Sequence, residues 1–148
     1  MLKNRIAMSA AAVLVAGILV PLTAQSASAQ TITSYCTTNQ YANTQLSTGH
    51  PTQALQCQMQ FLASRYGYTG PINGVLGQNS WKGIMAYLAD DWDYNGPVNG
   101  IPGVNTYKAM QRMGNAYGWS AAVTVDGSLG TRDWQNWAYG VRRQLTGE

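Results

Sequence analysis

The sequence has few charged residues and little of the chemistry on which catalytic sites depend. Only 10% of its 148 residues are Asp, Glu, Lys or Arg, and it holds one histidine and two cysteines. The formal net charge is +3, but Lys3 and Arg5 at the very start of the chain contribute to it. The nearly neutral remainder is poorly suited to nucleic acid, which needs a concentrated basic patch. We therefore expect no nucleic-acid partner.

The scarcity of histidine and acidic residues also argues against hydrolysis. A serine or cysteine nucleophile needs a base, and the single histidine, His50, stands beside a proline. Glycoside hydrolysis needs two carboxyl groups held across a sugar, but the only glutamate, Glu148, is the last residue. Asp126 is expected in a turn and Asp133 in the first turn of a helix, where the helix dipole favours it. We expect no catalytic residues, no cofactor and no enzyme activity.

One acidic cluster invites a metal interpretation. Asp91, Asp93 and Asn95 follow the opening pattern of an EF-hand calcium loop. Such a loop needs a bidentate glutamate at its twelfth position, where this chain has Pro102. We therefore predict no metal site, and interpret the cluster as the solvated end of a helix.

Apolar runs are confined to the start of the chain. Residues 1–29 have the features of a secretory signal peptide, with Lys3 and Arg5 before an apolar stretch and Ala27-Ser28-Ala29 as the cleavage site. The alternative, a membrane anchor, would need roughly 20 apolar residues, and the stretch from 6 to 20 is shorter. We expect a secreted monomer, extracellular or associated with the cell wall, that keeps no membrane segment after cleavage.

The two cysteines, Cys36 and Cys57, suit one disulfide in an exported chain. This bond would tie a polar leader, residues 30–50, to the first helix of the domain and contribute roughly 3 kcal/mol. The alternative is a metal site completed by His50. It would have three ligands, whereas structural zinc takes four, so we predict the disulfide.

A repeated turn is the strongest feature that the chain does have. Gly70-Pro71-Ile72-Asn73-Gly74-Val75-Leu76-Gly77 recurs as the segment 96–103 and, more loosely, as the segment 124–130. Asn-Gly and Asp-Gly tolerate positive φ, so the chain reverses cheaply there, and the last glycine suits the residue before a helix. An aromatic residue four positions further on shares a helical face with an apolar residue seven positions on.

Four helices follow from this pattern. We predict the first from Pro51 to near Gly67 and the others over residues 78–91, 104–117 and 131–145, each with an apolar stripe. The stripes contain in-register aromatics, which we assign to the core: Trp81, Tyr107 and Trp134. The expected fold class is all-α, a small bundle of three to four short helices joined by Gly-rich Asn/Asp-Gly turns.

These motifs resemble the bacterial peptidoglycan-binding domain, a small helical module attached to many cell-wall hydrolases. The matching residues are Leu55-Gln56, Leu62, Gly67-Tyr68, Gly70 to Gly77, and Val125 to Gly130 with Trp134. The resemblance covers roughly residues 52–145, within a domain of residues 51–148. The chain departs from the family pattern by having three turns where two are usual, and by having Asn in place of Asp in the first two.

The resemblance implies a non-catalytic module that binds glycan or stem peptide of the cell wall beside the turns. Aromatic residues at helix-to-turn edges can present a ring face to a sugar or peptide. The candidate ligand-binding residues are Tyr68, Asn73, Tyr94, Asn99, Arg112, Trp119 and Asp126. For the turn residues Asn73, Asn99 and Asp126, the alternative is that they serve only the backbone conformation of the turn. A second function remains open: a secreted protein–protein module that inhibits or regulates an extracellular cell-wall hydrolase or protease.

Overall fold

A computed structural model describes residues 29–43, 46, 49–118 and 120–148 of the chain. The expected signal peptide therefore lies outside the described residues, except for Ala29. Five α-helices make up this part of the chain: α1 (Ser34–Asn39), α2 (Gln53–Ser64), α3 (Gln78–Asp91), α4 (Val104–Tyr117) and α5 (Thr131–Thr146). The described segments contain no strand, only a parallel bridge between Ile32 and Ile72. The all-α fold class is confirmed.

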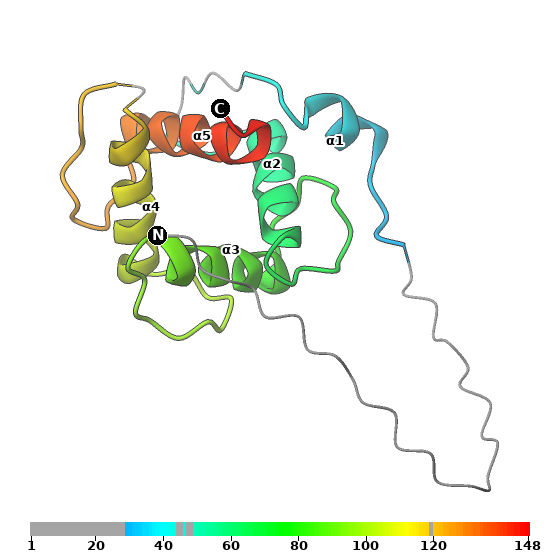
Figure 1. Cartoon of the computed structure of the whole chain (residues 1–148), viewed down its shortest axis with the longest axis horizontal. Coiled ribbons are helices and arrows are strands. Elements are labelled where there is room, and N and C mark those ends of the chain that lie inside the picture. The colour runs from blue at the N-terminus through cyan, green and yellow to red at the C-terminus, as the bar shows by residue number, and fades with distance from the viewer. Residues whose placement is uncertain (1–28, 44–45, 47–48, 119) are drawn as a thin grey trace, which may run out of the picture.

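Helices α2 to α5 form a four-sided frame, with α2 opposite α4 and α3 opposite α5 (Figure 1). The frame closes where α5 packs against α2. Arg65, at the end of α2, donates to the carbonyl oxygens of Gln144 and Leu145 in the last turn of α5, at 2.6 and 3.2 Å. A cation at a helix C-terminus interacts favourably with the helix dipole, so this contact links the two ends of the frame.

The helix starts follow from local capping chemistry. The Thr52 hydroxyl accepts from the Leu55 N–H at 3.3 Å, so α2 begins after Pro51 rather than at it. At α4 and α5 the N-cap glycines have no side chain to cap with, and the third residue of each helix accepts instead. Thr106 Oγ1 accepts from the Gly103 N–H at 3.2 Å, and Asp133 Oδ2 from the Gly130 N–H at 2.9 Å.

Two corners of the frame depend on small residues. A Cβ on Gly83 of α3 would lie 2.8 Å from Ala63 of α2, and one on Gly114 of α4 would lie 2.9 Å from Asn136 of α5. The core between the helices is fully buried and is built from large apolar and aromatic side chains, including Leu55, Met59, Ile84, Tyr87, Met113 and Trp137. Burial of this area is the main favourable term in folding.

The leader carries one helix that the sequence did not predict. α1 begins after Thr33, whose hydroxyl accepts from the Cys36 N–H at 3.3 Å. Cys36 is bonded to Cys57 of α2, as predicted. Gln58 of α2 also holds the leader, by donating to the carbonyl oxygens of Asn39 and Ala42 at 3.0 and 2.8 Å. The described residues therefore form five helices, one more than the four ranges predicted, because the disulfide and Gln58 fix α1 on α2.

Candidate functional site

The three Asn/Asp-Gly turns share one backbone geometry. In each turn the side-chain Oδ1 accepts from the N–H two residues further on: Asn73 from Val75 at 2.9 Å, Asn99 from Ile101 at 2.9 Å, and Asp126 from Ser128 at 2.8 Å. The glycines between them have φ of 76°, 79° and 83°. Side-chain bonding and positive φ are both typical of Asn/Asp-Gly turns. The site residues Asn73, Asn99 and Asp126 therefore hold the turns.

Two buried glutamines hold the first and third turns from beneath. Gln60 of α2 accepts from the backbone N–H groups of Asn73 and Gly74, both at 2.8 Å, and donates to Val75 O at 2.8 Å. Gln111 of α4 accepts from the Gly127 N–H at 2.8 Å and donates to Ser128 O at 3.0 Å. The same helix position in α3 is Met85, also fully buried. The second turn therefore lacks this support.

Gln111 also sets the electrostatics of the third turn. Its Nε2 donates to Asp126 Oδ1 at 3.0 Å and to Asp133 Oδ1 at 2.8 Å. The bond from Gln111, followed by that from the Ser128 N–H, lowers the pKa of Asp126 below its ordinary value of 3.8. Both carboxylates are thus bonded to the scaffold.

Three of the other four predicted ligand residues lie in structural positions. Tyr68 and Tyr94 are buried, and each hydroxyl donates within its own turn, to Pro71 O at 2.6 Å and to Pro97 O at 2.8 Å. Arg112 donates to the carbonyl oxygens of Trp92 and Asp93 at 3.0 and 2.9 Å. Trp119 lies outside the described residues. The tyrosines and Arg112 therefore shape the turns and the loop after α3.

A shallow hollow adjoins each turn, between the turn and the start of the next helix. We call these the first, second and third turn hollows. They have volumes of about 350, 220 and 420 Å³, and matching residues of the repeat line them. The first two are bounded by a tyrosine and a Gly-Pro pair, whereas the third is bounded by Gln111 and Val123. Since the turns lie at successive corners of the frame (Figure 1), the hollows are arranged around its rim.

Each turn hollow has an exposed polar side chain at the second residue of its helix, a position that is not among the predicted site residues. Asn79, Asn105 and Arg132 are each the second residue of their helices, and each lines its hollow. None of the three side chains hydrogen-bonds to another described residue, so their polar groups are available to a ligand. The repeated sequence aligns these three residues, since each stands two positions after the N-cap glycine.

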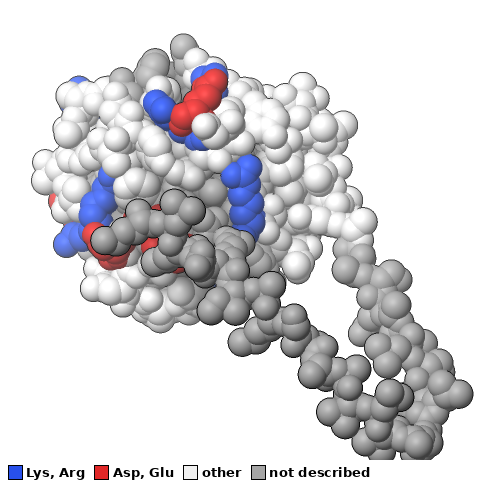
Figure 2. Space-filling view, in the orientation of Figure 1, with Lys and Arg blue, Asp and Glu red and all other residues white. Residues whose placement is uncertain are grey.

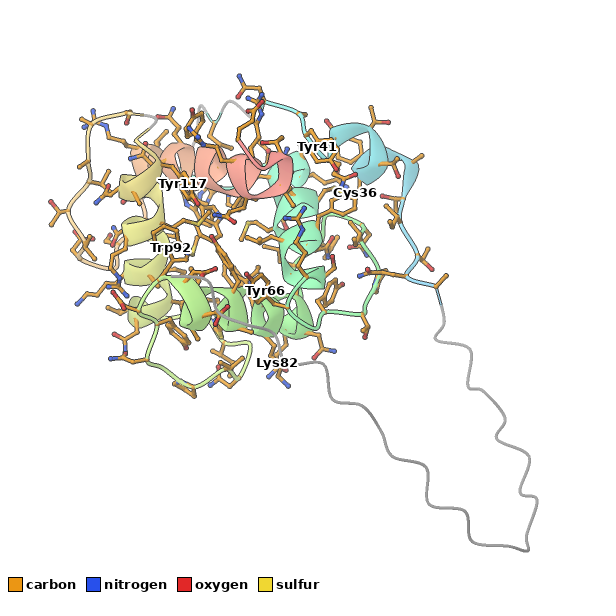
Figure 3. All side chains as sticks on the ribbon, in the orientation of Figure 1. Cys36, Tyr41, Tyr66, Lys82, Trp92 and Tyr117 are labelled. Carbon is orange, nitrogen blue, oxygen red and sulfur yellow. A yellow bond between two sulfur atoms is a disulfide. The ribbon has the colours of Figure 1, made fainter. Side chains whose placement is uncertain are left out.

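The aromatics at the helix ends gather in the middle of the frame. Figure 3 shows Tyr66, Trp92 and Tyr117 pointing inward from three sides. Trp92 and Tyr117 have ring centroids 5.8 Å apart, and Tyr66 packs edge-on against Tyr87 at 5.2 Å. Trp92 Nε1 donates to the hydroxyl of the buried Tyr87 at 2.7 Å, and burial raises the pKa of Tyr87. The side chains of Tyr66, Trp92 and Tyr117 are partly buried and pack against the core.

Charged side chains are sparse on the visible surface. Figure 2 shows them in small separate groups on an otherwise uncharged face. Over the part of the chain that the structure describes, no three His, Cys, Asp or Glu residues come together in a way that could hold a metal ion. The same residues include no helix that is long and apolar enough to span a bilayer.

Comparisons with known proteins found no matching family model, no matching curated protein and no matching solved structure.

Proposed function

We propose that this protein is a secreted, non-catalytic module that binds bacterial cell-wall peptidoglycan through its turn hollows. The observation that carries the proposal is the repetition of one arrangement: an Asn/Asp-Gly turn, a shallow hollow and, at the same helix position, a polar side chain that makes no hydrogen bond with other described residues. Asn79, Asn105 and Arg132 supply those side chains. A surface that repeats suits a polymer that repeats, because several weak contacts add up to retention.

The chemistry of the hollows suits the polymer. Glycan and stem peptide offer hydroxyl, amide and carboxylate groups, which an asparagine amide can pair with as donor or acceptor and an arginine as donor. Exposed aliphatic side chains stand beside the first two turn hollows, with Val75 and Ile101 both 66% exposed. They can cover the apolar face of a sugar ring or an alanine methyl group.

Binding alone is proposed because several of the groups that could react are engaged in the fold. Cys36 and Cys57 are joined. Asp126 and Asp133 both accept from Gln111, and His50 is exposed before α2. A base poised against a nucleophile is what hydrolysis would require, and these contacts serve the fold.

Sedimentation with purified insoluble peptidoglycan tests the proposal. The wild-type protein should pellet with the polymer, and a triple variant, Asn79→Ala/Asn105→Ala/Arg132→Ala, should be retained at least about fivefold less, since each lost hydrogen bond costs about 0.5–1.5 kcal/mol. Asn43→Ala, at an exposed leader residue, is the matched control and should pellet like the wild type. Enrichment no greater than that of an unrelated secreted protein would reject the proposal.

One observation favours the second candidate, a module that binds an extracellular hydrolase or protease. Three aliphatic side chains are exposed around the second turn: Val98 (45%), Ile101 (66%) and Val104 (57%). Grouped exposed apolar residues often mark protein interfaces. Co-purification from culture supernatant discriminates between the two functions, because a stoichiometric enzyme partner favours this one and sedimentation with cell walls favours the first.

A further inference from the structure

The leader of this chain shows how an extended segment docks on a turn. Thr33 N–H donates to Ile72 O at 3.0 Å, and Ile72 N–H donates to Thr31 O at 2.9 Å. Gln30 adds a side-chain bond to Gly70 O at 2.6 Å. Ile72 is thereby 1% exposed. The first turn thus has an edge that recognises backbone, and the leader covers it.

The second turn has the same edge without a cover. Val98 stands where Ile72 does, two residues before the positive-φ glycine, and is 45% exposed. Its N–H and C=O form no hydrogen bond with any residue that the structure describes, and the same is true of Gly96 O, the counterpart of Gly70 O. Tyr94 braces Pro97 O as Tyr68 braces Pro71 O. The backbone groups that the leader uses in the first turn are therefore not bonded by any described residue in the second.

A hollow also lies beside this edge of the second turn. It has a volume of about 320 Å³ and lies between Val98, the loop 66–70 and the outer face of α3; we call it the α3 hollow. Lys82 lines it and points away from the middle of the frame (Figure 3). Lys82 has the same helix position as Cys57, which holds Cys36 of the leader. Lys82 is exposed and makes no hydrogen bond or ion pair with other described residues.

We propose that the second turn docks an extended segment of a partner polypeptide, by adding it to the Pro97–Asn99 edge as the leader adds to the first turn. The leader defines the chemistry of that segment. A β-branched residue pairs with Val98, and a glutamine two positions earlier donates to Gly96 O. In the leader the chain turns into α1 after Thr33, which places Cys36, four positions after Ile32, on Cys57. A docked segment that takes the same helical turn brings its residue four positions on over Lys82, where an acidic side chain gives charge complementarity. Addition of a strand to a free edge is a common mode of peptide recognition.

Synthetic peptides that copy the leader test this with the oxidised protein. One peptide carries residues 29–38 with Cys36→Glu, and its matched control has Cys36→Lys. Titration of the ¹⁵N-labelled protein should move the amide signals of Gly96, Val98 and Asn99, with the Glu peptide binding about threefold more tightly, as one partly exposed ion pair allows. In Lys82→Glu, a surface substitution, the preference should reverse.

Val98→Pro removes the N–H that a docked segment must meet and should abolish the shifts in a protein that still unfolds cooperatively. The proposal is overturned by either of two results. One is the absence of saturable shifts over residues 96–99. The other is equal binding of both peptides to the wild type and to Lys82→Glu. Asn79 lines both the first turn hollow and the α3 hollow, but the peptide test depends on residues 96–99 and Lys82, which the sedimentation variants leave unchanged. Either proposal can therefore fail without the other.

Discussion

Gln111 of α4 and Gly127 of the third turn are joined by a hydrogen bond of 2.8 Å, from the glycine N–H to the side-chain Oε1. Gln60 of α2 holds Gly74 of the first turn in the same way and at the same distance. A turn of this kind is fixed by the buried side chain of the preceding helix as well as by its own sequence. The hollow beside it is therefore preformed, which lowers the entropic cost of binding.

Replacing either glutamine should destabilise the protein. Gln60→Met introduces the residue that α3 has at this position, and leaves the N–H groups of Asn73 and Gly74 without their acceptor. We expect a loss of about 2–4 kcal/mol in the free energy of unfolding, because unpaired buried polar groups cost about 1–3 kcal/mol each. Urea denaturation measures it. Asn43→Met, at an exposed leader residue whose side chain makes no hydrogen bond with other described residues, is the control and should change stability by less than about 0.5 kcal/mol; equal losses in both variants would contradict the prediction.

The glycines within and after the second turn should respond differently to alanine. Gly100 has φ of 79°, and a Cβ there would overlap the carbonyl oxygen of Gln78. Gly103 has φ of −146°, and a Cβ there would have no neighbour within 4 Å. We expect Gly100→Ala to lower the free energy of unfolding by at least about 2 kcal/mol and Gly103→Ala to change it by less than about 1 kcal/mol. Thermal unfolding of the two variants tests this difference, and similar melting temperatures would refute the assigned turn geometry.

Acid should weaken the third turn through Asp126. Its folded-state pKa is lowered, chiefly by the bond from Gln111, so its stabilising contribution is present above its ordinary pKa of 3.8 and is lost as the pH falls below that value. Asp126→Asn supplies the neutral residue of the other two turns. The variant should lose less stability than the wild type between about pH 5 and pH 2, as followed by circular dichroism. An unchanged acid dependence would mean that Asp126 has no part in it.

Reduction of the disulfide should release the leader from α2. The chain-entropy estimate gives a loss of about 3 kcal/mol in the free energy of unfolding. Because α1 and the bridge to Ile72 depend on this tether, the amides of Thr33 and Ile72 should exchange faster with solvent. Hydrogen exchange with and without reductant measures this. The double variant Cys36→Ser/Cys57→Ser should behave like the reduced protein and be indifferent to reductant.

The features predicted correctly are those set by local chemistry. Gly77, Gly103 and Gly130 each precede a helix, because an extended glycine followed by a periodic apolar stripe specifies a helix start within a few residues. The disulfide followed from having two cysteines. Helix α1 was missed because its polar sequence has no apolar stripe, and its position depends on Cys57 and on bonds from Gln58, which lie far along the chain.

The candidate site was harder to predict, because sequence does not give the direction of a side chain. Tyr68 and Tyr94 stand beside turns, where a ring could face a ligand, yet their hydroxyls turn inward to Pro71 O and Pro97 O. Gln60 has the polarity of a surface residue, and only the distant turn that it holds explains its burial. Asn79, by contrast, could have been found, since the repeat aligns it with Asn105 and Arg132.

The most direct test of the binding proposal is a titration of the ¹⁵N-labelled protein with soluble peptidoglycan fragments. If the turn hollows are one repeated binding site, the signals of Asn79, Asn105 and Arg132 should shift together and saturate at similar fragment concentrations. Shifts confined to other parts of the molecule, or none at any of the three helix starts, would contradict the proposal.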